Sequence, residues 1–142
     1  MQAIAPGAAL PDGDYVLGPE RHDQLVEALG GIAPADGSAH PLAAWVIALG
    51  GIGIGIGDLF AAAGVAMEDG PMLGACELTL RRPLDVGTRY AVSGTITDLQ
   101  AKTGRKLGRF DVLTIRLDVT DGDTTAATCT CSMILPRRQP LG

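Results

Sequence analysis

The chain has 142 residues, of which 46% are hydrophobic and 19% charged, and its formal net charge is -5. This length and apolar content suffice to bury the core of one domain, so they exclude intrinsic disorder and predict a single domain over residues 1–142. The acidic balance excludes a general attraction to nucleic acid or to anionic membranes, so an anionic ligand would have to meet a local basic patch.

The first elements in chain order are an irregular lead-in, a short strand and a short helix. Residues 1–12 are rich in alanine, proline and glycine, and they lack the basic segment followed by an apolar core that marks a signal peptide. Residues 14–17 fit a short first strand. Residues 19–29 fit a helix that two consecutive glycines end, and residues 32–39 have the composition of a turn.

The segment 41–66 is expected to form one long helix that is buried on all sides. Apolar residues and a glycine recur there at intervals of three and four, at Leu42, Val46, Leu49, Gly53 and Ile56. Between residues 51 and 57, glycine alternates with isoleucine at a period of two, which is a competing strand pattern. Five glycines inside a helix would cost several kcal/mol, at ~1 kcal/mol each, unless close packing offsets the loss. We expect that offset from a sheet wrapped around the helix, because a missing side chain lets two backbones approach.

The same segment raises two other possibilities, a membrane span and a phosphate-binding loop. Its uncharged part, residues 41–57, is shorter than the ~20 residues that a membrane span needs, so no membrane crossing is expected. The glycine spacing matches neither G-x-G-x-x-G nor G-x-x-x-x-G-K-[ST], so it does not predict a nucleotide site. A packing role for the glycines is therefore favoured.

From residue 71 onward the apolar period changes to two, which predicts a meander of four long strands. We expect these strands over residues 73–82, 90–99, 110–119 and 124–135. A basic turn at 102–106 joins the second and third strands, and Asp121-Gly122 is a hairpin turn between the third and fourth. Helices followed by an antiparallel sheet predict an α+β domain.

The three cysteines are Cys76, Cys129 and Cys131. Their number is odd and their spacing along the chain is not that of a metal site. We expect small buried thiols in a reduced, cytoplasmic protein, with no metal and no other cofactor.

Two stretches of sequence resemble the MaoC-like hydratases and dehydratases of the hot-dog superfamily. The first is Ala39-His40-Pro41-Leu42 followed by Leu49-Gly50-Gly51, which resembles the start of the family's central helix. The second is Arg82-Pro83-Leu84-Asp85-Val86-Gly87-Thr88, which resembles its R-P-L-x-x-G-[DET] turn, and the tail from Thr130 to Arg137 resembles its last strand. The likeness covers roughly residues 19–138 and implies a hot-dog fold, in which an antiparallel sheet wraps around a long central helix.

The resemblance implies an activity on acyl thioesters of CoA or of an acyl carrier protein, either dehydration of a 3-hydroxyacyl group or hydration of an enoyl group. The family's catalytic signature is D-x-N-x-x-H. The nearest text here runs from Asp36 to His40, is one residue shorter, and has Ser38 in place of the asparagine. We expect His40 to act as the base and Asp36 to orient it or to share the attacking water.

A second alignment matches His40 with the start of the central helix, where family members often have His-Gly. The catalytic loop is then largely missing, and His22 and Asp23 are the remaining acid–base candidates.

The expected substrate contacts lie at the start of the long helix and in the basic turn. Pro41 has no N–H, so Leu42 and Ala43 are expected to donate to the thioester oxygen, with Trp45 also in contact with substrate. Arg105 and Lys106 are expected to pair with the phosphates of CoA or of a carrier arm, or else to form an ordinary solvated loop. Arg81 and Arg82 are a second basic pair with the same two readings.

The resemblance also implies a homodimer or a pair with another hot-dog chain, because such domains join their sheets and form thioester tunnels where they meet. Two alternatives stay open. The chain is either a non-catalytic subunit that shapes the tunnel of a partner with the full signature, or a hot-dog thioesterase or tailoring enzyme that uses the same pocket.

Overall fold

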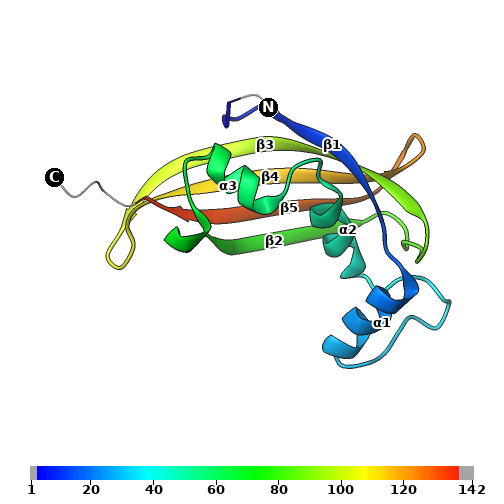
Figure 1. The fold of residues 1–142 in the computed structure, drawn as a ribbon. Coiled ribbons are helices and arrows are strands. Elements are labelled where there is room, and N and C mark those ends of the chain that lie inside the picture. Colours follow the sequence, from blue (N-terminus) through cyan, green and yellow to red (C-terminus); the bar gives the residue numbers. More distant parts are fainter. Residues whose placement is uncertain (1–2, 138–142) are drawn as a thin grey trace.

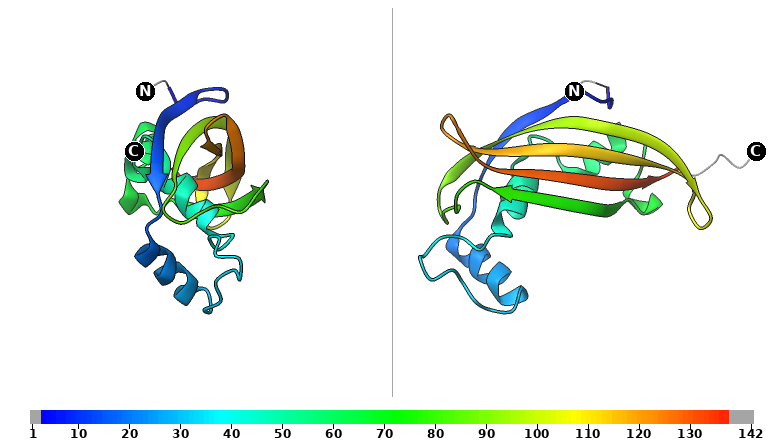
Figure 2. Two further views of the ribbon diagram at one scale, coloured as in Figure 1. Left: turned by 90° about the vertical axis from the view of Figure 1, so that its right-hand side faces the viewer. Right: turned by 180° about the vertical axis from the view of Figure 1, so that it is seen from behind.

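The computed structural model describes residues 3–137. Five strands form one antiparallel sheet in the order β1-β3-β4-β5-β2, and the sheet curves over two short helices (Figures 1 and 2). In chain order the elements are β1 (Ala9–Val16), α1 (Pro19–Ala28), α2 (Ala43–Gly51), α3 (Ile56–Ala62), the 3-10 turn η1 (Met67–Asp69), β2 (Met72–Leu80), β3 (Arg89–Gly104), β4 (Gly108–Asp121) and β5 (Thr124–Pro136).

The four long strands and α1 are confirmed, with ends that differ by a few residues from the expected ones. β3 and β4 extend further into the basic turn than expected, because their pairing continues to Gly104 and Gly108. The prediction that residues 1–12 are irregular is wrong for the last of these residues. β1 begins at Ala9 and pairs with β3 as far as Val16 and Arg89. Edge pairing supplies hydrogen bonds to this segment, although its proline and glycine disfavour a strand.

The prediction of a single long helix over residues 41–66 is also wrong, because the first helix ends at Gly51 and a second begins at Ile56. α2 and α3 are bent by 57° relative to each other. Between them, the Gly53 backbone N–H donates to the carbonyl oxygen of Pro11 in β1 at 2.9 Å. A side chain on Gly13 or on Gly53 would overlap the backbone of the other segment. The glycines therefore do allow close packing, but they do so by breaking the helix against β1.

α2 is buried on one face only. Its sheet-facing residues Ala43, Ala44, Ile47 and Ala48 have no exposed surface. Its other face, at Trp45, Val46 and Leu49, is only partly buried. The expectation of a helix buried on all sides is therefore wrong, and α2 keeps an apolar face that its own sheet does not cover.

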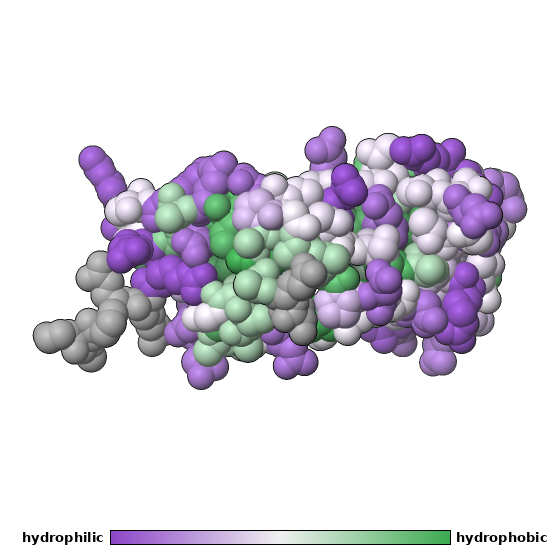
Figure 3. All heavy atoms as spheres, turned by 90° about the horizontal axis from the view of Figure 1, so that it is seen from above, coloured by the Kyte–Doolittle hydropathy of each residue, from purple (hydrophilic) through white to green (hydrophobic). Residues whose placement is uncertain are grey.

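Within the described residues, no single helix is long and apolar enough to cross a membrane, although the bent pair of α2 and α3 reaches that length and composition together. Viewed from above, the molecule is elongated, with hydrophilic atoms gathered at both ends and hydrophobic atoms in the middle (Figure 3).

Candidate functional site

The segment before α2 contains Asp36 and His40, but no hydrogen bond joins these two residues in the described part of the chain. One oxygen of Asp36 instead accepts hydrogen bonds from the Ser38 hydroxyl at 2.6 Å and from the Ser38 backbone N–H at 3.0 Å. These two bonds hold the pKa of Asp36 below its ordinary value. In this conformation the Asp36 carboxylate is therefore bonded within its own turn and not to the His40 ring that it is expected to orient.

His40 is held by hydrogen bonds on its backbone and on its ring. Its backbone N–H donates to Nε2 of the buried His22 at 2.9 Å, and its own Nδ1 accepts from the Leu42 backbone N–H at 3.1 Å. A neutral imidazole whose Nδ1 accepts a hydrogen bond carries its proton on Nε2. His40 therefore presents an N–H donor to its surroundings, and it would have to lose the Leu42 bond to present a free base at Nε2.

The structure gives the second pair of acid–base candidates, His22 and Asp23, different places. His22 lies under the segment before α2, where it accepts the His40 N–H and ties α1 to that segment. Asp23 is exposed on α1. Sequence spacing gave no sign of the contact between His22 and His40, because 18 residues separate them.

The start of α2 offers no free N–H to a substrate oxygen. The Leu42 N–H is bonded to His40 Nδ1, the Ala43 N–H to the His40 carbonyl at 2.8 Å, and the Trp45 N–H to the Leu42 carbonyl at 3.1 Å. The N–H groups of Leu42 and Ala43, which are expected to hold the thioester oxygen, are therefore both hydrogen-bonded within the chain. Ala43 is also completely buried, so its side chain does not meet a ligand.

Leu42 and Trp45, two of the predicted substrate contacts, line open space. With Cys76 and Leu78 they form a hollow of about 200 Å³. Trp45 also lines an adjoining, almost wholly apolar groove of about 260 Å³, whose other lining residues are Leu49, Ile56, Phe60, Met67, Pro71, Met72, Leu73 and Met133. This apolar groove follows the uncovered face of α2 toward α3 and β2, and its shape and chemistry suit an acyl chain.

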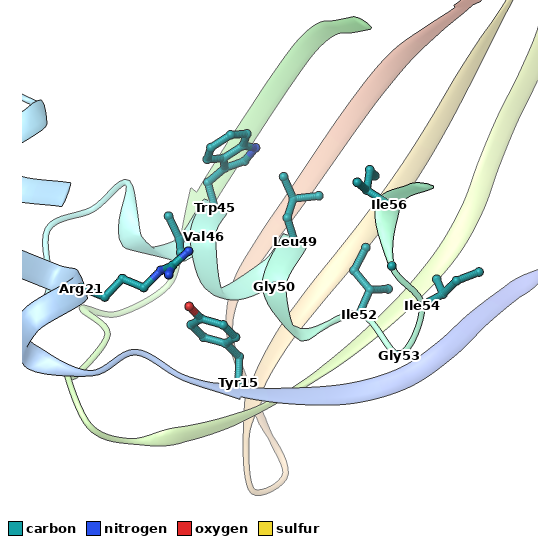
Figure 4. Close-up of a pocket in the computed structure, with 11 residues that line it drawn as sticks. Tyr15, Arg21, Trp45, Val46, Leu49, Gly50, Ile52, Gly53, Ile54 and Ile56 are labelled. Carbon is teal, nitrogen blue, oxygen red and sulfur yellow. The ribbon is translucent and has the colours of Figure 1, made fainter. Parts of the chain in front are cut away.

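A larger and more open hollow lies on the β1 side of α2. Its volume is about 780 Å³, and Figure 4 shows Tyr15 and Arg21 at one end and Ile52, Ile54 and Ile56 at the other. Its lining is more polar than that of the apolar groove. Sequence reasoning did not identify this hollow, because it arises from the break between α2 and α3.

The two basic pairs differ in their distance from His40. Arg105 and Lys106 occupy the β3–β4 hairpin turn, at the end of the molecule opposite the start of α2 (Figures 1 and 2). The structure therefore does not bring them to His40. Arg81 and Arg82 instead line a hollow of about 420 Å³ together with the segment before α2. Arg82 is paired with Asp121 at 2.8 Å, which leaves Arg81 as the less constrained cation.

The three cysteines gather at the β2 edge of the sheet, contrary to the expectation from their spacing along the chain. Cys76 of β2 is the register partner of Cys131 of β5, and Cys129 lies two residues away on the same face. The three sulfur–sulfur distances are 3.4, 3.5 and 3.5 Å. Cys129 and Cys131 are buried as expected, whereas Cys76 is exposed.

The thiols in this cluster differ in their ease of ionisation. A hydrogen bond from the Cys129 thiol lowers the pKa of Cys131 to about 6. The same contact, seen from the donor, raises the pKa of Cys129, and burial raises the pKa of Cys76. Cys131 is therefore the first of the three to become a thiolate.

Comparison with known proteins gives matches in structure but not in sequence. No family model and no curated protein sequence matches the chain. The ChsH1–ChsH2 complex of Mycobacterium tuberculosis contains a chain that matches with a TM-score of 0.62 at 22% identity, over 97% of this chain and 89% of that one.

Two other solved structures match over most of both chains. The C-terminally truncated HadBC complex of the same organism, a (3R)-hydroxyacyl-ACP dehydratase, matches with a TM-score of 0.65 at 15% identity, over 91% of this chain and 96% of that one. A MaoC-like dehydratase from Rhodospirillum rubrum matches with a TM-score of 0.56 at 17% identity, over 96% and 95%. At these identities the likeness establishes the fold alone. The chain therefore has the hot-dog fold, with an antiparallel sheet curved over a central helix that is broken in two.

Proposed function

We propose that this chain binds acyl thioesters of CoA or of an acyl carrier protein, as one subunit of a hot-dog hydratase or dehydratase. The observation that carries the proposal is the apolar groove along the uncovered face of α2. It begins beside Trp45, close to the segment that holds His40, and continues toward α3 and β2. An acyl chain laid along it would exchange water for apolar contact along its length.

A second chain is expected to close the apolar groove along β2. β2 is an edge strand that pairs with β5 on one side. Its residues Met72 and Leu73 are 44% and 51% exposed, and both line the groove. Exposed apolar side chains on an open strand edge favour pairing with another sheet. Either a second copy of this chain or a related hot-dog chain would complete the tunnel, and the ChsH1–ChsH2 and HadBC assemblies support this arrangement.

Within such an assembly, we propose that this chain shapes the acyl tunnel while a partner carries the complete catalytic signature. Asp36 is engaged with Ser38, and the ring of His40 accepts the Leu42 N–H. The N–H groups of Leu42 and Ala43 are also occupied. Three requirements of hydration are thus unmet at this position: a carboxylate beside the histidine, a free imidazole base and a free oxyanion donor.

A second candidate is a hydratase or dehydratase in which His40 acts as a proton donor. One observation favours it: His40 is half-buried and its Nε2 makes no hydrogen bond within residues 3–137, so its N–H is available to a ligand. In hydration, that group would deliver a proton to the α carbon of the enoyl thioester while water adds its oxygen to the β carbon, and the proton that the water loses would return to His40. Water activation would then depend on another residue.

The first experiment separates these two candidates. The purified chain is mixed with crotonyl-CoA and longer enoyl-CoAs, alone and with a co-expressed partner that has an intact D-x-N-x-x-H motif, and loss of the enoyl absorbance is followed. The tunnel-shaping proposal expects no hydration by the chain alone and turnover with the partner. Turnover by the chain alone that His40→Gln abolishes and Asp36→Asn leaves intact would establish the second candidate. Release of free thiol would point instead to a thioesterase.

Binding is tested separately through Trp45, which is the only tryptophan of the chain. Octanoyl-CoA is expected to shift and saturate its emission, whereas CoA without an acyl chain has a much smaller effect. Met72→Asp places a charge in the apolar groove and should weaken octanoyl-CoA binding, with Asp23→Ala on exposed α1 as the control. Equal affinity for CoA and octanoyl-CoA would contradict the assignment of the groove.

We propose Arg81 rather than Arg105 and Lys106 as the contact for the phosphates of CoA. Arg81 borders the hollow beside the segment before α2, whereas the other two lie at the far end of the sheet. Arg81→Glu is expected to weaken octanoyl-CoA binding in low salt, and the Arg105→Glu, Lys106→Glu double variant is the control with a larger charge change. A greater loss in the double variant would reverse this assignment. We also propose a cytoplasmic location, because three free cysteines suit a reducing compartment.

A further inference from the structure

The cysteine cluster at the β2 edge is not used by the proposed acyl-thioester function. Its three sulfurs all lie within 4.8 Å of one another, and each residue offers one ligand atom. They come from two neighbouring strands, so the hydrogen-bonded ladder between β2 and β5 fixes their relative positions. Such a group is arranged before any ligand arrives, which reduces the conformational entropy that binding would cost.

The spacing of the sulfurs specifies where an ion would sit. The three sulfur–sulfur distances, 3.4, 3.5 and 3.5 Å, describe a nearly equilateral triangle. An ion bonded to each sulfur at ~2.3 Å, the usual zinc–thiolate length, would lie about 1.1 Å out of the plane of that triangle. In this position the ion is the centre of a distorted tetrahedron, with the three sulfurs at three of its corners and the fourth coordination position open. It fits tetrahedral zinc better than a planar three-coordinate ion.

The surroundings of the sulfurs provide both access and a hydrogen-bond donor. Cys76 borders the hollow that Leu42, Trp45 and Leu78 also line, so an ion and a fourth ligand such as water can reach the cluster from that side. The Trp45 indole N–H is buried and makes no full hydrogen bond in the described residues, but it lies close enough to Cys131 to help lower the pKa of that thiol. A buried donor without a partner costs free energy, and a metal-bound thiolate beside it would supply an acceptor.

We propose that Cys76, Cys129 and Cys131 form a binding site for a thiophilic d10 metal ion, and that zinc(II) is the ion their spacing fits best. Binding replaces the three thiol protons with one zinc ion. Three protons are released, three zinc–sulfur bonds form, and the local charge changes from zero to -1. No electron transfer is involved.

The competing chemistry for the same atoms is a disulfide. Cys76 and Cys131 are directly opposite on neighbouring strands, so an oxidant would join these two most readily. The two chemistries differ in how many sulfurs they use. Zinc protects all three thiols reversibly, and a disulfide consumes two thiols and leaves the third reactive.

The test uses the full chain, reduced with a phosphine and freed of metal. Zinc(II) is titrated in competition with a chromophoric chelator, copper(I) is titrated in parallel, and native mass spectrometry gives the stoichiometry. Cobalt(II) is added as a spectroscopic probe, because its thiolate charge-transfer absorption grows with the number of sulfur ligands. Cys76→Ser is the main variant, since Cys76 is exposed on an edge strand and its change should leave the fold intact. Thr130→Ser is the matched control, on the opposite face of β5 between the two buried cysteines.

The expected result is one zinc ion per chain, with all three thiols protected from alkylation. Cys76→Ser should weaken zinc binding by roughly 100-fold and reduce the cobalt–thiolate absorption, while Thr130→Ser behaves as the unmodified chain. Zinc binding that is unchanged in Cys76→Ser, or protection of no thiols, would overturn the proposal. Oxidation to a disulfide in a chain that never binds zinc or copper(I) would overturn it as well. Octanoyl-CoA binding by the metal-free chain is measured alongside, so failure of this site is separate from failure of the acyl-binding proposal.

Discussion

The contact between β1 and the break in the central helix gives a sharp stability prediction for Gly13→Ala. The new methyl carbon would overlap the Gly51 carbonyl oxygen and would lie 2.9 Å from the Gly53 nitrogen and 3.1 Å from the Ile52 carbonyl carbon. All three of these atoms belong to the backbone, so no side chain can rotate away to make room. β1 and the segment after α2 must therefore separate, which also stretches the hydrogen bond from Gly53 to Pro11.

The expected change in the free energy of unfolding combines two destabilising terms and one stabilising term. Overpacking a close contact costs ~1–3 kcal/mol, and weakening a backbone hydrogen bond costs about 1 kcal/mol. Replacing glycine with alanine returns ~0.4–1 kcal/mol by restricting the unfolded chain. The net loss is about 1–3.5 kcal/mol. At ~4 °C per kcal/mol for a chain of this length, Tm should fall by roughly 4–14 °C.

The assay is urea unfolding followed by circular dichroism, together with a thermal scan. Gly18→Ala is the matched control, because a methyl group there meets nothing within 4 Å and Gly18 has an ordinary extended conformation before α1. Its free energy of unfolding should change by less than about 1 kcal/mol, because alanine is a poorer N-cap residue than glycine but restricts the unfolded chain more. If Gly13→Ala proves as stable as Gly18→Ala, the close approach of β1 to the helix break does not hold, and the account of the broken helix is refuted.

Two further predictions concern the segment before α2. His22→Ala removes the acceptor of the His40 N–H and should lower the free energy of unfolding by ~1–3 kcal/mol in urea titrations, whereas Asp23→Ala on exposed α1 should change it little. A loss no larger than the Asp23→Ala loss would contradict a supporting role for His22. Ser38→Ala removes the hydroxyl that lowers the pKa of Asp36, so the carboxyl resonance should titrate at a higher pH than in the unmodified chain. Because the folded pKa is depressed, the stability that this contact adds is present above the ordinary pKa and is lost as the pH falls through the lowered one. An unchanged titration of Asp36 would show that Ser38 is not the cause.

Much of the fold is predictable from local pattern. The change of apolar period from 3.6 to two after residue 71 locates the four long strands, because a half-buried strand must alternate its side chains whatever it packs against. The glycine pair after residue 29 likewise places the end of α1, at Ala28. For the glycine run around residue 53, the sequence predicts close backbone packing but does not predict that the helix breaks there. Close backbone contact can be achieved by a continuous helix or by a broken one, and only the position of β1 decides between them.

The candidate site is less predictable, because its chemistry depends on which hydrogen bonds are already made. In the sequence alone, a carboxylate and a histidine four residues apart resemble a catalytic pair. In the structure, Asp36 is engaged by Ser38, and both the backbone and the ring of His40 are engaged by other residues. The spacing of two residues along the chain does not show which hydrogen bonds their side chains already make.

The antiparallel sheet, the helix α1 and the apolar character of the segment that the sheet covers can be predicted from local pattern, because they depend on the periodicity of neighbouring residues. Tertiary packing, in contrast, sets the break in the central helix, the hydrogen bonds of its first N–H groups and the opening of its outer face. It also brought Cys76, 53 residues before Cys129, to within 3.5 Å of that sulfur. A contact between distant residues depends on strand order and register, and neither is written in the local pattern of either strand.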